Sequence, residues 1–242
     1  MIVVDRVVVV VPARDEERLL PVCLDSLRVA RRVLAQRRPE VRVEVVVVLD
    51  RCTDASAAVV AGRADVHGVV STHGCVGAAR ATGVSVALQG PGDPATTWLA
   101  NTDADTVVPA DWLLAQVELA GQGLDLVLGT VVPHDLESRV LQAWTQRHHL
   151  REGHPHVHGA NLGVRASRYL AAGGFCAVPL HEDVLLAEAV KASGAPWLAT
   201  DATRARTASR RRGRVGGGFA TYLRELTAEV GAAEAEAAAA GP

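Results

Sequence analysis

Runs of β-branched residues alternate with segments of helical spacing along the first half of the chain. Residues 7–11 and 41–49 are continuously rich in apolar residues, which is typical of strands buried on both faces of a sheet. The segments after them place apolar residues three or four positions apart, as the buried stripe of a helix does. This alternation predicts βαβ units and a mostly parallel sheet with helices on both faces. Strands are expected over residues 7–11, 41–49, 66–70 and 96–101, and helices over residues 15–38, 54–63, 77–88 and 109–120.

The pattern is less regular in the second half. A strand is expected over residues 124–132, and the polar stretch 134–158 holds six of the nine histidines. We interpret this stretch as an exposed helix and loop, with metal binding by imidazole as the alternative. The Ala- and Glu-rich end, residues 228–242, indicates a frayed helix or a disordered tail. Further short elements are expected over residues 157–164, 167–172, 182–192 and 197–200.

Composition favours one folded domain and argues against nucleic-acid binding. With 242 residues, 49% of them apolar and 21% charged, the chain can bury a sizeable core. Aromatic residues make up 3%, too few for a platform that stacks single-stranded nucleic acid. The net charge of −2 gives no general attraction to nucleic acid or to anionic membranes. We therefore expect no nucleic-acid partner.

The cysteines and the N-terminal residues predict a soluble, cytoplasmic protein. The four cysteines are scattered and form no CxxC pair, so neither a zinc site nor a disulfide framework is expected. The first apolar run stops at Pro12, is too short to span a bilayer and lacks the features of a signal peptide. We expect no transmembrane segment, and the oligomeric state is open, with a homodimer as one option.

Polar or charged residues follow each of the first four expected strands. In open α/β sheets, ligands bind in the crevice beyond the carboxyl ends of the strands. Because the four ends share one edge of the expected sheet, they predict a binding site there. These ends are residues 12–17, 50–54, 71–74 and 101–105.

Asp103 and Asp105 form a DxD pair directly after an expected strand. Residues two apart in an extended segment point to the same side, and two carboxylates so placed repel unless a cation lies beside them. Hard oxygen ligands favour Mg²⁺ or Mn²⁺, which complete their shells with substrate phosphates. A solvated turn or a helix cap is the alternative, but the position at a strand end favours a metal site.

Two other features of this edge suit a nucleotide. Asp50 either accepts hydrogen bonds from a base or ribose, or caps the next helix together with Asp54. Gly74, Gly77 and Arg80 either cradle a phosphate at a helix terminus or form a tight turn followed by an exposed Arg. The sequence has no Walker A lysine and no GxGxxG after the first strand, which disfavours a P-loop NTPase and a dinucleotide-binding domain.

Five short motifs follow one another along the chain. They are VVVVPARDEE at 8–17, LDRCTD at 49–54, GAAR at 77–80, DAD at 103–105 and ED at 182–183. Their order resembles that of family 2 glycosyltransferases of the GT-A fold, over about residues 5–195. The resemblance implies an α/β fold with a single Rossmann-like domain, a nucleotide-sugar donor, a divalent metal and inversion at the anomeric carbon.

The resemblance also implies roles for individual side chains. Those expected to line the nucleoside pocket are Pro12, Ala13, Arg14 and Glu16. Those expected to contact other parts of the donor or the metal are Asp50 (base), Arg80 (base or phosphates), Asp103 (ribose or metal) and Asp105 (metal). Asp183 falls at the position of the family's general base.

Two departures limit what the resemblance implies. Leu49 replaces the first acid of the second motif, and Arg51 and Cys52 stand where Gly and Ser are common. UDP-sugars and GDP-sugars are therefore both open as donors. The sequence lacks the QxxRW motif and the membrane helices of processive members, which argues against processive polymer synthesis.

The acceptor side depends on residues of the second half. Asp183 is either the base that deprotonates the acceptor hydroxyl or an acid that stabilises the macrodipole of its helix. Glu182 either orients the site or binds the acceptor. His158, Gly159 and Asn161 lie where family members line the pocket for the donor sugar and the acceptor, with burial in the core as the alternative.

The resemblance also suggests a domain organisation. A GT-A domain is expected over residues 1–218, with a nucleotide-binding half over 1–132 and an acceptor-side half over 133–218, followed by a C-terminal helix and Ala-rich tail over 219–242. The Arg- and Gly-rich segment 204–214 is either a flexible lid that closes over the diphosphate or a solvated face. Trp112 is expected in the core.

The sequence therefore predicts an inverting glycosyltransferase with a divalent metal at Asp103 and Asp105 and Asp183 as base. Its acceptor would be an unidentified small molecule, lipid or glycan. A retaining transferase of the same fold, in which Asp183 is only structural, is one alternative. A catalytically silent nucleotide-sugar-binding module is another, although the presence of all three acids argues against it.

Overall fold

A computed structural model describes residues 3–148, 150–178, 180–209 and 219–239. The chain divides into two compact units. The first contains residues 1–132 and 151–207, and the second contains residues 133–150 and 208–242. The polar strand ends singled out in the sequence all belong to the first unit.

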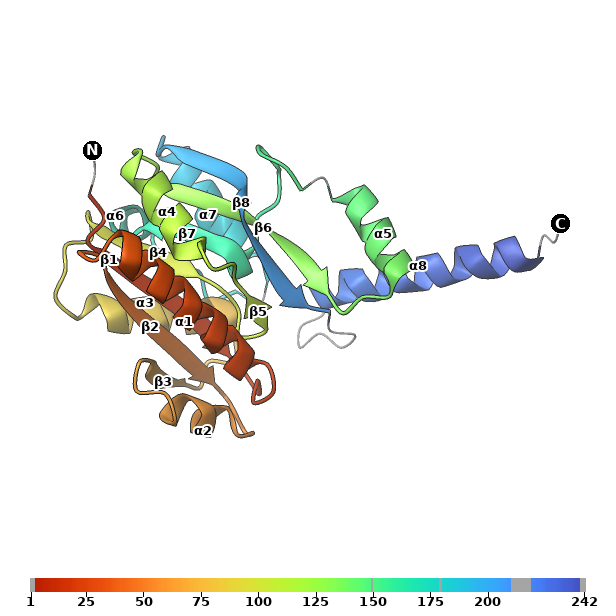
Figure 1. Ribbon diagram of the computed structural model, residues 1–242, viewed down its shortest axis with the longest axis horizontal. Coiled ribbons are helices and arrows are strands. Elements are labelled where there is room, and N and C mark those ends of the chain that lie inside the picture. The colour runs from red at the N-terminus through yellow and green to blue at the C-terminus, as the bar shows by residue number, and fades with distance from the viewer. Residues whose placement is uncertain (1–2, 149, 179, 210–218, 240–242) are drawn as a thin grey trace. The chain divides into compact units, whose positions relative to one another are not determined.

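The first unit is built on an eight-stranded sheet with the order β3-β2-β1-β4-β7-β6-β8-β5 (Figure 1). Strands β1 to β4 pair in parallel, whereas β7 is antiparallel to both β4 and β6, and β5 is antiparallel to β8. The α/β class with a mixed, mostly parallel sheet is thereby confirmed. The strands are β1 (Arg6–Ala13), β2 (Arg42–Asp50), β3 (His67–Ser71), β4 (Thr97–Asn101), β5 (Thr106–Val107), β6 (Leu126–His134), β7 (Leu162–Arg165) and β8 (Trp197–Ala208).

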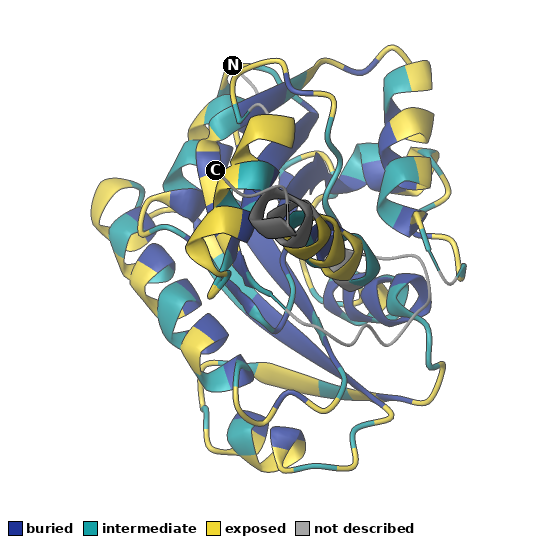
Figure 2. Ribbon diagram, turned by 90° about the vertical axis from the view of Figure 1, so that its right-hand side faces the viewer, coloured by how far each residue is buried: buried dark blue, intermediate teal, exposed yellow. Residues whose placement is uncertain are grey.

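Alternate side chains of β1 pack into two different apolar cores. Val7, Val9 and Val11 join a cluster with residues of α1 and α4, whereas Val8 and Val10 join a cluster with residues of α3, α6 and α7. All five valines have an exposed fraction of 0%, as expected for a strand covered on both faces. Figure 2 shows such buried strands between helices whose outer turns are exposed. The helical segments are α1 (Leu20–Arg37), α2 (Ser56–Ala61), α3 (Val76–Leu88), α4 (Trp112–Gly121), α5 (Ser138–Arg147), η1 (Gly159–Asn161), α6 (Ala166–Ala171), α7 (Glu182–Ala192) and α8 (Phe219–Ala239).

The last strand corrects one expectation from the sequence. The strand expected over residues 197–200 continues to Ala208, because Thr203, Ala205 and Thr207 are buried while the side chains between them are exposed. Arg204 and Arg206 thus belong to a strand and not to a flexible lid. The remainder of the expected lid, residues 210–214, lies outside the described part of the chain.

The second unit contains helices α5 and α8. The imidazole of His148 stacks on the indole of Trp144 with 4.3 Å between ring centroids, and its edge meets Tyr222 of α8 at 5.3 Å. Trp144 is 1% exposed, so α5 has a buried face that was not expected in the polar stretch 134–158. His149 lies outside the described residues. Across the described ranges, no helix has both the length and the apolar character required to cross a bilayer.

Candidate active site

The carboxyl ends of β1 to β4 lie next to one another in the sheet. The parallel register pairs Ala13 with Leu49, Asp50 with Ser71, and Val10 with Asn101. The loops that continue from these strands therefore meet at one edge, where ligands bind in open α/β sheets.

Asp50, at the end of β2, is held by the loop after β3. The residue is 4% exposed, and its Oδ1 accepts hydrogen bonds from Ser71 Oγ at 2.9 Å and from the Gly74 N–H at 3.0 Å. The described residues provide no partner for its Oδ2, so this oxygen can accept a further hydrogen bond. Asp50 does not cap α2, because the N–H of Ser56 donates to Asp54 instead.

The loop after β1 is fastened to the loop after β2. Asp15 has a left-handed backbone with a φ of 51°, and its Oδ1 accepts a hydrogen bond from the Thr53 N–H at 2.6 Å. This hydrogen bond lowers the pKa of the Asp15 carboxyl from its ordinary value, against the opposing effect of burial. The four residues expected to line the nucleoside pocket differ in exposure. Ala13 and Glu16 are buried, at 2% and 6%, whereas Pro12 and Arg14 are partly exposed.

The ligand atoms of Asp15, Cys52 and Asp54 lie within 4.8 Å of one another in these loops. The Asp54 carboxylate accepts hydrogen bonds from the N–H groups of Ser56 and Glu17, both at 2.9 Å. The carboxylates of Asp15 and Asp54 therefore hold the loops after β1 and β2 together through hydrogen bonds to backbone N–H groups. This structural role explains the cluster.

Asp103 and Asp105 follow β4 and are fixed by two different elements. Asp103 Oδ1 accepts a hydrogen bond from Arg80 Nη2 of α3 at 2.5 Å. Asp105 Oδ1 accepts one from Thr207 Oγ1 of β8 at 3.3 Å. The side chain of Asp103 is 35% exposed, so its carboxylate reaches the surface of the site.

The buried thiol of Cys23 lies behind this loop and donates a hydrogen bond to the carbonyl oxygen of Asp103 at 3.3 Å. Burial, followed by the carboxylates of Asp105, Asp103 and Glu16, raises the pKa of Cys23 well above its ordinary value. Carboxylates that raise the pKa of a thiol in this way also attract a cation. Asp103 and Asp105 supply the hard oxygen ligands that Mg²⁺ and Mn²⁺ prefer, so these residues fit a divalent metal.

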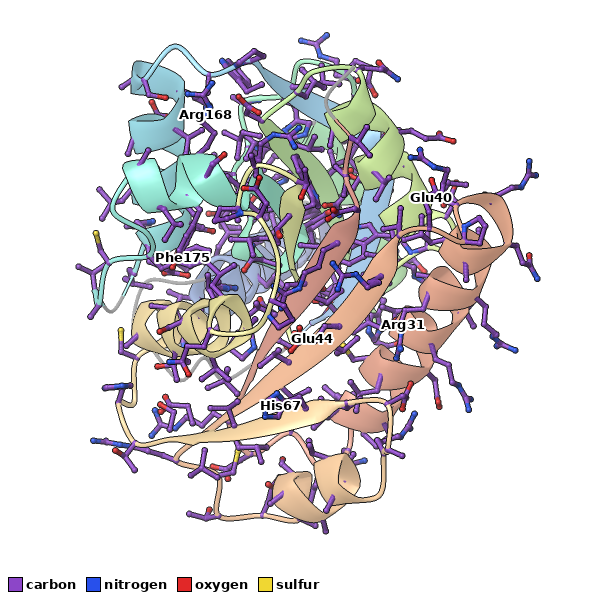
Figure 3. The ribbon with its side chains drawn as sticks, turned by 90° about the vertical axis from the view of Figure 1, so that its left-hand side faces the viewer. Arg31, Glu40, Glu44, His67, Arg168 and Phe175 are labelled. Carbon is purple, nitrogen blue, oxygen red and sulfur yellow. The ribbon has the colours of Figure 1, made fainter. Side chains whose placement is uncertain are left out.

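Arg80 lies between the DxD loop and the start of helix α7. Its side chain is 3% exposed and forms ion pairs with Asp103 and with Glu182, whose side chain is 5% exposed. The centre of the guanidinium lies 5.8 Å from the ring centroid of Phe175, which lies beside α3 (Figure 3). Burial raises the pKa of the Glu182 carboxyl, and the charge of Arg80 opposes this effect. The nearby carboxylate of Asp183 raises that pKa further. The expected contact between Arg80 and the donor would thus compete with two existing ion pairs.

Two glycines leave room for this arrangement. A Cβ on Gly159 would lie 2.6 Å from the guanidinium carbon of Arg80, so the backbone at this position packs directly against the arginine. A Cβ on Gly77 would lie 3.0 Å from the Cβ of Glu182 and would collide with the carbonyl oxygen of Cys176. Side chains at either position would displace the ion pairs.

Asp183 stands in the first turn of α7 and is tied to Gly159. Its Oδ2 accepts a hydrogen bond from the Gly159 N–H at 2.6 Å, and its Oδ1 accepts one from the Val184 N–H at 2.8 Å. His181, the residue before the helix, has a φ of 65°. A left-handed non-glycine residue costs on the order of 1–3 kcal/mol and occurs often at functional sites.

Asn161 is placed differently from what the resemblance implies. It is 1% exposed, its Oδ1 accepts a hydrogen bond from Trp112 Nε1 at 2.8 Å, and its Nδ2 donates to the carbonyls of Thr130 and Thr203. The amide is thus engaged by the protein on both sides, which favours the alternative of a buried core residue. Trp112 is 0% exposed, which confirms its expected place in the core.

His158 ends a row of alternate histidines. The rings of His154 and His156 stack with 5.7 Å between centroids, and those of His156 and His158 with 5.9 Å. His154 is 3% exposed and lies 3.2 Å from the carbonyl oxygen of Leu128. The row therefore leads from the core to His158, which is partly exposed next to Gly159.

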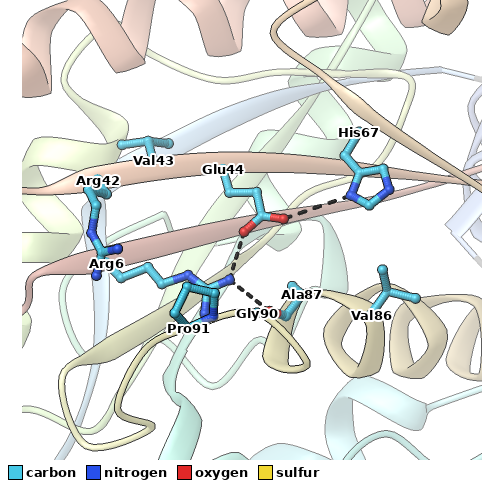
Figure 4. Close-up of a pocket in the computed structure, with 9 residues that line it drawn as sticks. All are labelled: Arg6, Arg42, Val43, Glu44, His67, Val86, Ala87, Gly90 and Pro91. Carbon is cyan, nitrogen blue, oxygen red and sulfur yellow. Dashed lines mark hydrogen bonds and ion pairs between the residues drawn. The ribbon is translucent and has the colours of Figure 1, made fainter.

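The opposite edge of the sheet has a cavity of about 360 Å³ that is separate from this site (Figure 4). Arg6 lines it and donates hydrogen bonds of 2.7 Å to Glu44 and to the Ala87 carbonyl near the end of α3. The first contact neutralises the buried Arg6 with the carboxylate of Glu44, and the second satisfies a carbonyl near the end of α3. Both are structural roles.

Thr207 and Phe175 were not identified from the sequence as parts of the site. Thr207 lies in a stretch that was interpreted as a lid or a solvated face because of its arginines. The alternation of small and charged residues from Thr203 to Ala208 is nevertheless typical of a strand. Phe175 follows two glycines and carries no sequence signal for contact with Arg80.

A family model and several solved structures are similar to this chain. The model of the family described as "Glycosyl transferase family 2" matches residues 8–166. Residues 1–349 of S. aureus TarS superpose with a TM-score of 0.61 at 16% identity, covering 84% of this chain and 60% of that one. A mannosyltransferase from Pyrobaculum calidifontis, solved with GDP-Man and Mn²⁺, gives a TM-score of 0.59 at 21% identity, covering 98% of this chain and 76% of that one. The M. tuberculosis glucosyl-3-phosphoglycerate synthase gives 0.53 at 17% identity, covering 93% and 77%.

These structural likenesses establish the fold. The chain spans less than two thirds of two solved TarS chains, 60% of one and 42% of the other. A search of curated proteins found no match. The family model covers more than half of the chain and includes the strand ends at which the site is built. The chain therefore belongs to glycosyl transferase family 2.

Proposed function

We propose that this chain transfers a sugar from a nucleoside-diphosphate donor to an acceptor hydroxyl, with inversion at the anomeric carbon. The observation that carries the proposal is that Arg80 forms two ion pairs, one with Asp103 and one with Glu182. They join the DxD loop after β4 to the helix that bears Asp183. The acids expected to serve the metal and the acceptor thus belong to one connected site.

The donor is assigned to the carboxyl edge of β1 to β4. Asp50 has one carboxylate oxygen fixed by Ser71 and Gly74, and the other is available to accept a hydrogen bond from a base. Pro12 and Arg14 are the partly exposed residues of the neighbouring loop. Uracil and guanine both offer an N–H to such an acceptor, so UDP- and GDP-sugars are both candidate donors.

Asp103 and Asp105 are the residues assigned to a divalent metal, Mn²⁺ or Mg²⁺. When bound, such an ion supplies Lewis-acid stabilisation of the departing diphosphate. The chain itself contributes the orientation of the two carboxylates, through Arg80 on one side and Thr207 on the other.

Asp183 is assigned the role of general base. It takes the proton of the acceptor hydroxyl while the acceptor oxygen bonds to the anomeric carbon, and the bond from that carbon to the diphosphate oxygen breaks with its electron pair. The Gly159 N–H fixes one oxygen of the Asp183 carboxylate. His158, next to Gly159 and partly exposed, is assigned to the lining of the acceptor pocket.

The test is a panel of UDP- and GDP-sugars, with and without Mn²⁺ or Mg²⁺, in which nucleoside diphosphate release is measured with a mixture of candidate acceptors. We expect metal-dependent turnover that falls to background in Asp105→Ala and persists in Asp111→Asn, an exposed control nearby. The anomeric configuration of the product is then read by NMR. Turnover that is unaffected by EDTA, or by Asp105→Ala, would contradict the proposal, and retained configuration would refute the role of Asp183.

A further inference from the structure

We infer that Arg80 is a positioning residue, which holds Asp103 and the start of helix α7 together and does not itself bind the donor. This inference rests on the proposed function, because it concerns the same site. It replaces the expected contact of Arg80 with the base or phosphates.

Both terminal nitrogens of the Arg80 guanidinium are already paired with carboxylates. Its Nη2 donates to Asp103 and its Nη1 to Glu182. Its Nε is buried and has no hydrogen-bond partner among the described residues. A donor phosphate at this arginine would therefore lie beside two carboxylates that already balance its charge.

The guanidinium is also enclosed by neighbours that restrict its movement. The ring of Phe175 lies 5.8 Å away, and the backbone of Gly159 is so close that a Cβ there would be 2.6 Å from the guanidinium carbon. A planar, rigid guanidinium held in this way fixes the direction of both of its ion pairs.

The contacts of Arg80 form a closed ring of interactions that returns to Arg80 through Gly159. Arg80 binds Asp103 and Glu182, Glu182 precedes Asp183, and Asp183 accepts a hydrogen bond from the Gly159 N–H at 2.6 Å. Gly159 then packs against Arg80. A shift of Arg80 therefore moves both the DxD loop and the proposed base.

The positive charge of Arg80 is needed for this ring of interactions, because two of its members are ion pairs. An arginine stays protonated in proteins, so the guanidinium carries its positive charge beside Asp103 and Glu182. Without this charge, three carboxylates would repel one another across the site.

The experiment compares Arg80→Gln and Arg80→Lys with the wild type. Arg165→Lys is the matched control, because the Arg165 side chain is also 3% exposed and is paired with Asp125 at 2.7 Å, in an ion pair outside the site. The experiment measures kcat and KM for the donor, the Kd of UDP and GDP in EDTA, where no metal on the DxD loop contributes to binding, and the hydrogen exchange of the Gly159 amide.

We expect Arg80→Gln to lower kcat by about 100-fold, as misplacement of reacting groups does, while the Kd measured in EDTA stays unchanged. The Gly159 amide should exchange faster, because its bond to Asp183 loosens. Arg80→Lys should recover part of kcat, since an ammonium can still pair with one carboxylate, and it also serves if Arg80→Gln fails to fold. Arg165→Lys should leave all of these quantities unchanged.

A weaker Kd with little change in kcat would overturn the inference and make Arg80 a donor ligand. Unchanged kcat and unchanged Gly159 exchange in both Arg80 variants would overturn it as well. If the wild type shows no transfer, the proposed function fails, and the Gly159 exchange still decides whether Arg80 positions the loop and the helix.

Discussion

Arg80 and Glu182 form a buried ion pair across 102 positions of the sequence. Removing one member of such a pair leaves an uncompensated charge in the interior, which typically costs about 3–5 kcal/mol. The gain from forming the pair is smaller, because both groups lose their hydration. What the pair provides is a fixed relation between α3 and the first turn of α7.

Asp183→Asn should separate donor binding from transfer. The amide keeps the shape of the side chain but cannot accept the acceptor proton, so we expect kcat to fall by roughly 100-fold or more with the Kd for UDP or GDP unchanged. Glu188→Gln, an exposed change on the same helix, is the control. Transfer at the original rate in Asp183→Asn would remove this residue as the base.

Gly159→Ala should disturb activity more than its size suggests. The new Cβ would lie 2.6 Å from the guanidinium carbon of Arg80 and would force that side chain or the loop to move. We expect a loss of stability of about 1–3 kcal/mol, as in overpacked cores, together with a loss of kcat. Gly121→Ala is the control, because nothing lies within 4 Å of its Cβ. Urea unfolding and steady-state kinetics measure both effects, and wild-type kinetics in Gly159→Ala would contradict the packing argument.

Asn161→Ala should destabilise the fold strongly. It would leave Trp112 Nε1 and the carbonyls of Thr130 and Thr203 without the partner they have now. Each buried group left unsatisfied costs about 1–3 kcal/mol, so we expect the free energy of unfolding to fall by roughly 3 kcal/mol or more. Urea unfolding measures this, with the exposed Gln122→Ala as control. A change in the free energy of unfolding no larger than that of the control would show that the hydrogen bonds of Asn161 do not stabilise the fold.

Asp201→Asn should lower stability in a pH-dependent way. Burial acts to raise the pKa of Asp201, but hydrogen bonds from Arg204 and Thr130 outweigh it and lower that pKa. A lowered folded-state pKa stabilises the protein above the unfolded value, and this contribution is lost as the pH falls through the folded value. The Arg204 side chain is 46% exposed, so we expect a difference of only about 1 kcal/mol.

Urea unfolding of the wild type and Asp201→Asn at a series of pH values tests this. The difference should be full at neutral pH and should shrink once the pH falls below about 4, the ordinary Asp value. Asp111→Asn, an exposed acid, is the control. A difference that grows toward low pH would have the wrong sign for this ion pair.

The parallel half of the sheet could be predicted from the sequence because its signals are local. Continuous apolar runs such as Val7 to Val11 require burial on both faces, and the polar residues after them mark the strand ends. The DxD pair and the order of the motifs identified the family for the same reason. The second half of strand β8 was missed because Arg204 and Arg206 were given more weight than the period-two pattern around them.

The sequence by itself determined the strand–helix alternation, the acids at the strand ends and the family, all of which depend on spacing along the chain. The tertiary structure decided which of these residues touch. Arg80 pairs with Asp103 and Glu182, and Asn161 is buried and accepts a hydrogen bond from Trp112. Spacing cannot reveal such pairings, because buried charges and amides take whichever partner the folded chain brings within hydrogen-bond reach.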